Sequence, residues 1–425
     1  MGSLFIIIHK GTMRQSFYFG MLQGFLYYGS TLIWFTRIFG LAAISLFAIL
    51  AFFVALFCLI ACALKWRMRH PLIDAMLMAT LWTGIEYYRS EWFPLHFSWA
   101  TPGVTVGPDW FTPYVGAYGV SFLIVFAGVL FSRIRDIPLW NQTFAVLVCI
   151  LLYFPLPKKY PVNPVRVIAV QKEDAPLEDY ITATRKWRFY HPEFVVWPEY
   201  AIPEDIRRVR TDEKKIMQMV RDMKTVLVFG TRTDTGNRLG DWRNTALVVN
   251  PHGELGRYYK NRPVPLFQEG IPGTHAEPIS TPMGTIGTPI CFDNDFEEID
   301  RKMVAKGAQL LLAPSMDEAS WSRTEHLQHA LQFRLRAAEN RRWMLVASSS
   351  GLTEIIDPDG RMHGFLPMMQ PGVLAGEVEM ISARTFYNKI GWIGGPLCFF
   401  MSLFLITDSL FWMGLQRIAR RLSHA

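Results

Sequence analysis

The stretch TIGTPICFD, residues 285–293, is a largely apolar, β-branched run that leads into a cysteine, and the rest of the chain can be interpreted outward from it. Cys291 directly follows a strand-like run from Met283 to Ile290, so its side chain would be displayed at the end of a strand. The remaining cysteines lie in segments apolar enough to sit in a membrane: Cys58, Cys62, Cys149 and Cys398. Cys291 is therefore the cysteine best placed to act as a nucleophile.

Two further reactive side chains lie upstream at the ends of strand-like runs. Glu199 ends the run 194–199, and Lys260 follows the run 255–259. A thiol at its ordinary pKa is mostly protonated at neutral pH, so Cys291 needs a base and a nearby positive charge. Glu199 can be the base and Lys260 the charge, and the three together indicate covalent acyl chemistry. Each one alone would more often be a solvated strand end.

The short motifs around these residues carry more information than the residues alone. In chain order they are WPE (197–199) with AIP (201–203), GRYYK (256–260) with VP (264–265), PICFD (289–293), RAAEN (336–340) and IDPDG (356–360). This series resembles the nitrilase, or carbon–nitrogen hydrolase, superfamily and, within it, the membrane branch formed by the bacterial apolipoprotein N-acyltransferases. The resemblance spans nearly the whole chain. It implies that Glu199, Lys260 and Cys291 are catalytic, with Lys260 and the backbone N–H after the cysteine stabilising the oxyanion.

Residues 158–389 are expected to form one catalytic domain with an α/β fold, because short β-branched runs alternate there with amphipathic stretches. The expected strands are 165–170, 194–197, 226–229, 245–249, 285–290, 310–313, 344–347 and 354–356, and the clearest helices are 205–224 and 324–342. Gly253 and Gly360 end turn motifs and should have positive φ. The resemblance implies a nitrilase-like αββα sandwich, which periodicity alone does not distinguish from other α/β folds.

Membrane spans are predicted on both sides of this domain. Five stretches of at least about 18 residues carry no charge: 15–36, 38–64, 110–132, 137–157 and 390–407. A sixth apolar stretch, 71–89, contains Asp74 and Glu86. We therefore expect about five spans in a membrane domain, 1–157, and one span followed by a basic tail in 390–425. The catalytic domain is inserted between them.

The distribution of basic residues predicts the orientation of these spans. Lys and Arg gather after or before alternate spans, at positions 10, 14, 65, 67, 69, 133, 135, 417, 420 and 421. The positive-inside rule then puts both termini in the cytoplasm and the catalytic domain on the extracytoplasmic, periplasmic side of a bacterial inner membrane. The net charge is +7, but residues 158–389 hold 31 basic and 30 acidic residues, so the excess reflects topology and not nucleic-acid binding. No cleavable signal peptide is expected.

Several residues are candidates for supporting roles in the catalytic domain. Family members usually have a second glutamate eight residues after the lysine, where this chain has Gln268, and we assign the role to Glu269. Phe292 and Asp293 replace the Tyr and Glu that commonly follow the nucleophile. The loop 263–267, together with Trp321, would either cover an acyl pocket or pack within the domain.

Other candidates lie in the membrane part or belong to a cluster of histidines. Glu86, Arg89 and Trp99 fall in a segment that resembles the membrane part of the acyltransferases. Glu86 and Arg89 are three apart, so they are either functional or neutralise one another, and Trp99 could equally be an interfacial anchor. His326 and His329 share a helix rich in charges, and we expect neither a metal site nor a cofactor there.

The resemblance implies a reaction in two halves. Cys291 would take an acyl chain from a membrane phospholipid as a thioester, and the N-terminal amine of a diacylglyceryl-cysteine apolipoprotein would then accept it. A membrane-tethered amidohydrolase acting on a small C–N substrate, and a non-catalytic lipid-binding scaffold, are the alternatives. Compared with the family pattern, we expect this chain to lack one or two of the leading spans that family members usually carry.

Overall fold

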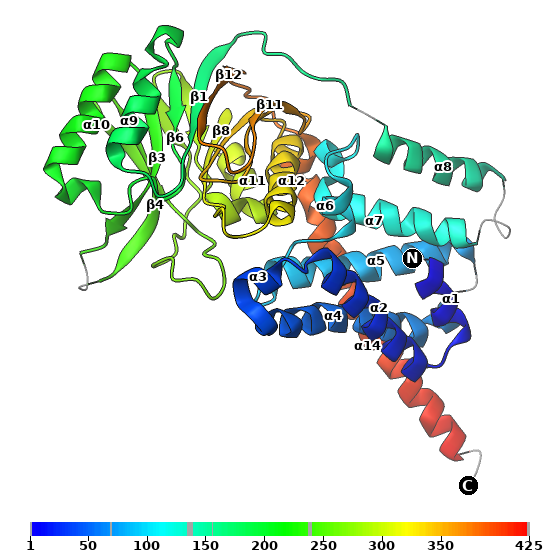
Figure 1. Cartoon of the computed structure of the whole chain (residues 1–425). Coiled ribbons are helices and arrows are strands. Elements are labelled where there is room, and N and C mark those ends of the chain that lie inside the picture. The colour runs from blue at the N-terminus through cyan, green and yellow to red at the C-terminus, as the bar shows by residue number, and fades with distance from the viewer. Residues whose placement is uncertain (1, 69, 134–138, 155, 237–239, 423–425) are drawn as a thin grey trace. The chain divides into compact units, whose positions relative to one another are not determined.

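The computed structural model describes residues 2–68, 70–133, 139–154, 156–236 and 240–422 (Figure 1). The chain divides into two compact units. The helical unit comprises residues 1–106, 115–154 and 391–425, and the α/β unit comprises residues 107–114 and 155–390.

The α/β unit contains two six-stranded sheets. The first has the order β12-β1-β2-β3-β4-β5, with β1 (Val165–Gln171), β2 (Phe194–Val196), β3 (Val226–Asp234), β4 (Trp242–Asn250), β5 (Gly253–Tyr259) and β12 (Gly372–Val378). The second has the order β11-β10-β9-β8-β7-β6, with β6 (Ile279–Thr281), β7 (Gly284–Gly287), β8 (Leu310–Ser315), β9 (Met344–Ser348), β10 (Thr353–Ile356) and β11 (Met362–Leu366). The strands β1, β2 and β3 are parallel, as are β7, β8 and β9.

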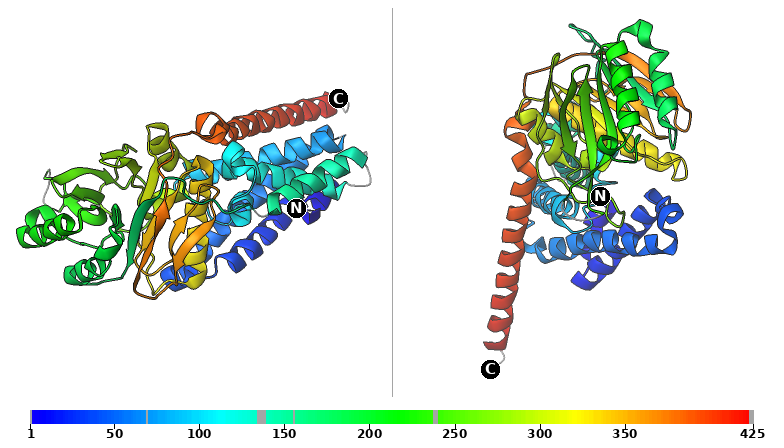
Figure 2. Two further views of the ribbon diagram at one scale, coloured as in Figure 1. Left: turned by 90° about the horizontal axis from the view of Figure 1, so that it is seen from above. Right: turned by 90° about the vertical axis from the view of Figure 1, so that its left-hand side faces the viewer.

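Alternation along the strands determines which layer each side chain joins, because neighbouring residues of a strand point to opposite faces. Val167 and Ala169 of β1 belong to the core shared with the second sheet. Ile168 and Val170 pack instead with residues of α9 (Leu177–Arg185) and α10 (Arg210–Met223). The other sheet is covered by α11 (Glu297–Ala305) and α12 (Arg323–Asn340). The predicted αββα sandwich is confirmed, and its four layers can be followed in Figures 1 and 2.

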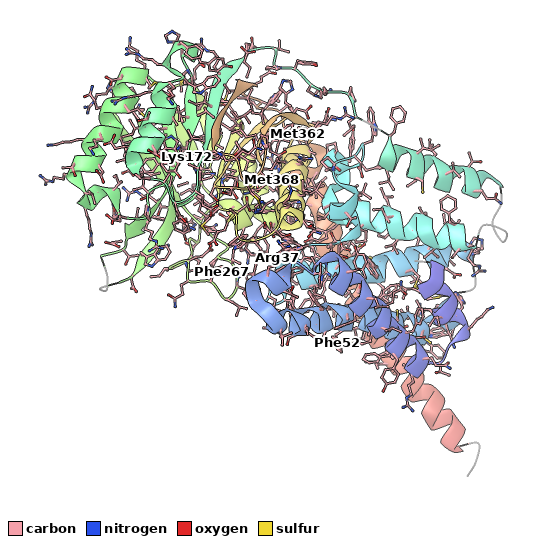
Figure 3. The ribbon with its side chains drawn as sticks, in the orientation of Figure 1. Arg37, Phe52, Lys172, Phe267, Met362 and Met368 are labelled. Atoms are coloured by element: carbon pink, nitrogen blue, oxygen red, sulfur yellow. The ribbon has the colours of Figure 1, made fainter. Side chains whose placement is uncertain are left out.

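The two helices that the amphipathic pattern predicted in this unit, 205–224 and 324–342, correspond to α10 and α12. In α10, Ile216, Met219, Val220 and Met223 are buried at helical spacing, although the helix proper begins at Arg210 after a short turn. In α12, the Ser322 hydroxyl accepts from the Thr324 N–H and caps the first turn. A smaller apolar cluster lies beside these layers: Met362 and Met368, labelled in Figure 3, pack with Ala330 and Leu352.

Two local predictions can be compared with the backbone. Gly253 (φ 139°) and Gly360 (φ 79°) have the positive φ expected of their turns. The strand expected over 285–290 is shorter, because β7 ends at Gly287. Pro289 has no N–H to give to a ladder, so the chain leaves the sheet before it reaches the cysteine. The nucleophile candidate therefore sits in a loop and a short 3₁₀ turn, Cys291–Asp295.

The helical unit is built from apolar helices. They are α1 (Gly2–Lys10), α2 (Met13–Thr31), α3 (Phe35–Phe39), α4 (Ala43–Ala63), α5 (Pro71–Tyr87), α6 (Pro102–Val106), α7 (Thr112–Ser132), which starts in the α/β unit, α8 (Leu139–Tyr153) and α14 (Gly394–Leu422). Figure 2 shows α14 as one continuous helix. Gly20 and Gly24 let α2 approach α4 closely, since a Cβ there would lie within 2.9 Å and 2.8 Å of Ala55 and Ala51 Cα.

Three segments of the described chain are long and apolar enough to cross a membrane: Phe35–Ala63, Thr112–Ser132 and Gly391–Trp412. They match three of the six predicted spans. The other three correspond to α2, which is less apolar, and to α5 and α8, which have 17 and 15 residues. The predicted span 137–157 also includes positions outside the described residues. These three spans stay predictions.

Candidate active site

Glu199 lies three residues beyond the end of β2, in a tight turn against β3. A Cβ on Gly230 of β3 would collide with the Glu199 Cα, so the close approach requires glycine there. The Glu199 carboxylate is buried, and its Oε1 accepts from Asn244 Nδ2 at 2.6 Å and Lys260 Nζ at 3.0 Å. Its Oε2 accepts from the Met316 N–H at 3.0 Å. Burial raises the pKa of Glu199, and Lys260 opposes that shift.

Lys260 follows β5 directly, as the sequence indicated, and only 2% of it is exposed. Its Nζ lies between two carboxylates, at 3.0 Å from Glu199 and 2.9 Å from Glu269. Burial alone would lower the pKa of Lys260, but the two carboxylates outweigh burial and raise it well above its ordinary value. The ammonium therefore stays charged at neutral pH and provides a fixed cation inside the domain.

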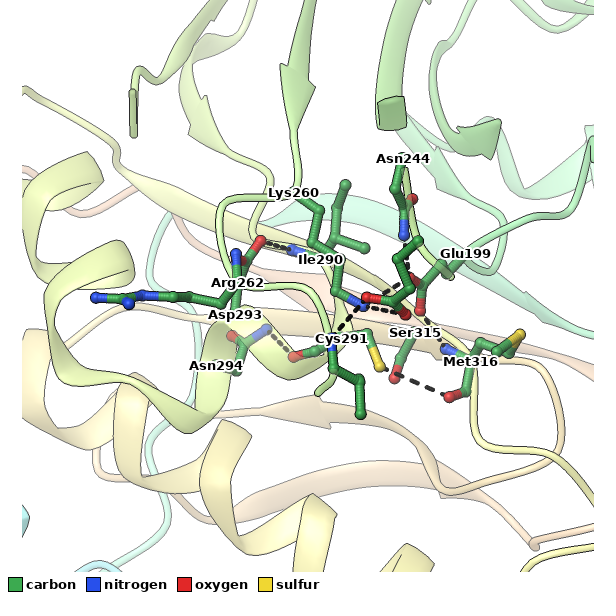
Figure 4. Close-up of polar contacts among 12 residues, drawn as sticks. Glu199, Asn244, Lys260, Arg262, Ile290, Cys291, Asp293, Asn294, Ser315 and Met316 are labelled. Atoms are coloured by element: carbon green, nitrogen blue, oxygen red, sulfur yellow. Dashed lines mark hydrogen bonds and ion pairs between the residues drawn. The ribbon is translucent and has the colours of Figure 1, made fainter. Parts of the chain in front are cut away.

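Cys291 begins the short 3₁₀ turn with φ 46°, a left-handed conformation that a non-glycine residue rarely adopts. Strain of this kind is often found where a side chain must be aimed. Its thiol donates to the Met316 carbonyl at 3.6 Å (Figure 4). Burial and the Glu199 carboxylate raise the pKa of Cys291 well above its ordinary value, while Lys260 opposes them. The resting group is a thiol, so a base must take its proton during attack.

Two residues of this site were missed by the sequence analysis. Asn244 lies in β4, one residue before the predicted strand, and donates to the carboxylate of Glu199. Met316 follows β8 and contributes only backbone atoms, which reach both Glu199 and Cys291 (Figure 4). A buried Asn in an apolar strand is a signal that could have been noticed. No side-chain pattern could have revealed Met316.

The supporting candidates divide into two groups. Glu269 is buried, and its Oε2 accepts from the Val264 N–H at 2.8 Å while Oε1 holds Lys260. Glu269 thus contacts Lys260, although it lies one residue after position 268, where family members usually have this glutamate. Asp293 instead organises the backbone: its oxygens accept from the Arg262 N–H at 2.8 Å and the Ile290 N–H at 3.1 Å.

Asp293 has a further bond that fixes its place in the core. Its Oδ2 accepts from the Tyr258 hydroxyl at 2.9 Å. Burial raises the pKa of Asp293 to about 7, and Lys260 opposes that shift. Phe292 contributes an aromatic contact, with its ring centroid 5.2 Å from that of Phe296. These two residues therefore hold the turn that presents the cysteine.

The loop 263–267 carries apolar side chains next to the lysine segment. Leu266 has φ 73° and is 84% exposed, so it lies at the outer surface of the α/β unit. Phe267, labelled in Figure 3, lies with its ring centroid 6.1 Å from that of Trp321. Both of the expected roles, covering a pocket and packing within the domain, are compatible with this arrangement.

His329 takes part in a buried cluster on α12 next to the β8 segment. Its Nδ1 lies 2.6 Å from Asp317 Oδ1, and its Nε2 lies 3.6 Å from Asp295 Oδ1. Burial would lower the pKa of His329, but Asp317 and Asp295 raise it to about 10. Ligand atoms of Asp317, Glu325 and His329 do gather within 4.8 Å of one another, but a metal would have to displace the imidazolium proton. His326 makes a different contact, with its Nε2 3.0 Å from the Glu318 carbonyl.

The candidates in the helical unit are all buried. Glu86 accepts from Ser121 Oγ at 2.6 Å and from Trp82 Nε1 at 2.8 Å. Arg89 donates to the Tyr28 hydroxyl and lies over that ring. Within the described residues no ion pair joins Glu86 to Arg89, but the Arg89 charge interacts with the Glu86 carboxylate over a longer distance, so both alternatives stay open. Trp99 packs on Trp34, with ring centroids 5.0 Å apart. Their functional roles stay predictions.

Comparison with known proteins identifies two family models that match this chain. The model described as Carbon-nitrogen hydrolase matches residues 177–387, and the model described as Apolipoprotein N-acyltransferase N-terminal domain matches residues 1–130. The first model covers the segments that carry Glu199, Lys260 and Cys291. The second covers much of the helical unit.

Curated relatives match both parts together. The apolipoprotein N-acyltransferase of Geobacter metallireducens is 28% identical and aligns with 89% of this chain and 84% of its own. That of Azotobacter vinelandii is also 28% identical, over 84% of this chain and 77% of its own. Among solved structures, Saccharomyces cerevisiae Nit3, a member of branch 10 of the nitrilase superfamily, is 20% identical over 52% of this chain and 93% of its own, with a TM-score of 0.45.

Proposed function

Because the chain belongs to the apolipoprotein N-acyltransferase family, the membrane branch of the nitrilase superfamily, we propose that it transfers an acyl chain from a membrane phospholipid to the N-terminal amine of a diacylglyceryl-cysteine apolipoprotein. The proposal rests on one observation: three buried residues from separate segments, Glu199, Lys260 and Cys291, lie together in one site. Relatives named for this activity along most of the chain support it. A ping-pong mechanism uses this arrangement in two half-reactions.

In the first half-reaction Cys291 Sγ attacks the ester carbonyl of the phospholipid while Glu199 accepts the thiol proton. The raised pKa of both groups suits this transfer, because burial and the Glu199 carboxylate outweigh Lys260 and keep Cys291 a thiol in the resting site. Lys260 and the N–H of Phe292 would stabilise the oxyanion. The intermediate collapses, Glu199 returns the proton to the leaving oxygen, and a lysophospholipid departs. A thioester on Cys291 remains.

In the second half-reaction the neutral α-amine of the apolipoprotein attacks the thioester. Glu199 takes a proton from the attacking nitrogen and delivers it to the departing sulfur, so the thiol is regenerated and an amide forms. The fixed charge on Lys260 stabilises the second oxyanion as it did the first. Glu269 keeps Lys260 in place through its 2.9 Å contact. The net change is one ester exchanged for one amide.

The membrane setting follows the same proposal. Three segments of the described chain are long and apolar enough to span a bilayer, which supports a membrane-embedded acyl donor. We infer from the basic residues flanking the spans that both termini are cytoplasmic and that the α/β unit is extracytoplasmic. Exclusion of water from the thioester would favour transfer over hydrolysis. The exposed Leu266 on the loop 263–267 is suitably placed to meet an acyl chain.

The first test is intact mass spectrometry of the detergent-purified full chain after incubation with phospholipid. We expect a mass gain of one acyl chain that hydroxylamine removes and that a diacylglyceryl-cysteine peptide discharges. The Cys291→Ala variant should show no gain. If no phospholipid acylates a wild-type protein whose thiol reacts with iodoacetamide, the transferase proposal is wrong. Release of ammonia from small amides in that case would identify a tethered amidohydrolase.

A further inference from the structure

Met316 connects the proposed base to the proposed nucleophile through its own backbone. Its N–H donates to Glu199 Oε2 at 3.0 Å, and its carbonyl accepts from Cys291 Sγ at 3.6 Å. Figure 4 shows both contacts reaching this one residue. Because the two groups belong to a single residue, a rotation of its peptides would disturb the carboxylate and the thiol together. The orientation of Met316 therefore controls the geometry of proton transfer.

The next residue, Asp317, is anchored on every polar atom by the described part of the chain. Its Oδ2 accepts from Ser348 Oγ at 2.7 Å, and its Oδ1 lies 2.6 Å from His329 Nδ1. Its N–H donates to Ser349 Oγ at 3.1 Å, and its carbonyl accepts from that same hydroxyl at 3.1 Å. Ser315, on the other side of Met316, also reaches the carboxylate, at 3.3 Å. Met316 is thus held at the residue before it and at the residue after it.

His329 supplies the positive charge that makes this anchor rigid. The imidazole is 3% exposed and faces Asp317 and Asp295, with the carboxylates of Glu325 and Glu354 also near enough to interact with its charge. A buried anion such as Asp317 is costly unless it is paired and hydrogen-bonded, and here it is both. Asp317 keeps a pKa of about 2: burial raises it, but His329 outweighs burial. The pair therefore stays ionised throughout the neutral range.

We propose that Asp317 and His329 are positioning residues that hold the Met316 backbone against Glu199 and Cys291, and so set the rate of acyl-enzyme formation. This inference rests on the proposed function for its effect on rate, while its structural part concerns Cys291 and Glu199 directly. Neither residue touches the reacting atoms. Their effect is transmitted through Met316, one covalent bond away from Asp317.

The test compares variants in single-turnover acylation of the full chain by phospholipid. Asp317→Ala should slow acyl-enzyme formation at least about 30-fold without changing the half-saturating phospholipid concentration, because a misplaced base and nucleophile lower the rate and not the binding. Loss of the Met316 N–H bond raises the pKa of Glu199, so the acidic limb of the pH–rate profile should move to higher pH. Asp317→Asn should recover part of the rate, since its amide still reaches Ser348 and His329.

The matched control is Glu339→Gln, which breaks the buried 2.8 Å ion pair of Glu339 with Arg336 on the same helix and leaves Met316 untouched. It should lower the melting temperature while keeping the wild-type rate per folded molecule and the wild-type pH profile. If Asp317→Ala matches this control in rate and in acidic limb, the positioning role is refuted. If Asp317→Ala does not fold, Ser349→Ala should still slow acylation about 3- to 10-fold, and a wild-type rate would refute the proposal equally.

A second readout does not depend on any substrate. Alkylation by iodoacetamide, followed at Cys291 by peptide mapping, reports the pH midpoint of that thiol. Asp317→Ala should lower the midpoint, because the Met316 carbonyl no longer holds the protonated thiol and a neighbouring negative charge is gone. An unchanged midpoint would contradict the inference. If the wild type is never acylated but the midpoint still shifts relative to Glu339→Gln, the proposed function fails while the positioning role stands.

Discussion

Replacing Glu269 by glutamine tests whether the Lys260 ammonium needs both of the carboxylates that contact it. The substitution keeps the size of the side chain but removes one of the two carboxylates that hold the ammonium, at 2.9 Å. The glutamine amide has one oxygen and one NH₂ group, so it can accept from only one of two donors, Lys260 Nζ or the Val264 N–H, which Glu269 Oε2 now accepts at 2.8 Å. The NH₂ group then faces the other donor. One buried polar group is left without its partner in either orientation.

The expected loss follows from that unsatisfied group. A buried donor without an acceptor costs about 1–3 kcal/mol, and about 2 kcal/mol expressed in the transition state corresponds to about 30-fold in rate. The pH dependence should change as well. Glu269 raises the pKa of Glu199, so its removal lowers that pKa and moves the acidic limb of the acylation profile to lower pH.

The assay is single-turnover formation of the acyl-enzyme, followed by intact mass spectrometry at a series of pH values. Glu298→Gln is the matched control, since Glu298 pairs with Arg262 at 2.5 Å outside the site and its loss removes a carboxylate of the same kind. A wild-type rate for Glu269→Gln would show that Lys260 does not need this second carboxylate. An acidic limb that moved upward would refute the expected fall in the pKa of Glu199, because the electrostatic sign would then be wrong.

Three further variants test separate contacts. Asn244→Ala removes the 2.6 Å donor to Glu199, and a lost bond to a charged group is worth about 1.5–3 kcal/mol. Acylation should therefore slow at least about 10-fold, and the acidic limb of the pH–rate profile should move to higher pH, opposite to its movement in Glu269→Gln. If both variants moved the limb in the same direction, both assignments would be contradicted. Gly230→Ala should nearly abolish acylation, because its Cβ would push on the Glu199 backbone; normal turnover would mean that the turn tolerates displacement. Tyr258→Phe removes the 2.9 Å donor to Asp293, which should lower the melting temperature by a few degrees in a thermal scan; an unchanged melting temperature would show that the aspartate does not need this bond.

Much of the α/β fold could be predicted from periodicity, because strand and helix patterns are local properties of the chain. The alternation of Val167 and Ile168 between two cores, for example, follows from the two-residue repeat of a strand. The end of β7 at Gly287 could also have been predicted, since Pro289 cannot continue a ladder. The short edge strands β6 and β11 carry no such clear repeat and were found only in the structure.

Composition alone predicts some of the membrane spans and not others. Segments such as 38–64 are apolar along their whole length, so the sequence identifies them without help from tertiary contacts. In contrast, α5 contains Glu86, which is tolerated because Ser121 and Trp82 satisfy its oxygens. Whether such a polar group is satisfied depends on neighbouring helices, which no window of sequence contains.

The prediction of which groups do the chemistry needed only consecutive residues. Glu199, Lys260 and Cys291 stand at or near the ends of recognisable strands, within motifs that a family shares, and these are features of consecutive residues. Tertiary structure alone decided how the three are held. Asn244 lies 45 residues from the carboxylate it contacts, and Met316 lies 117 residues from it. Contacts of that separation arise from the pairing and packing of two sheets. Met316 contributes only its backbone N–H, which leaves no mark in the choice of amino acid at that position.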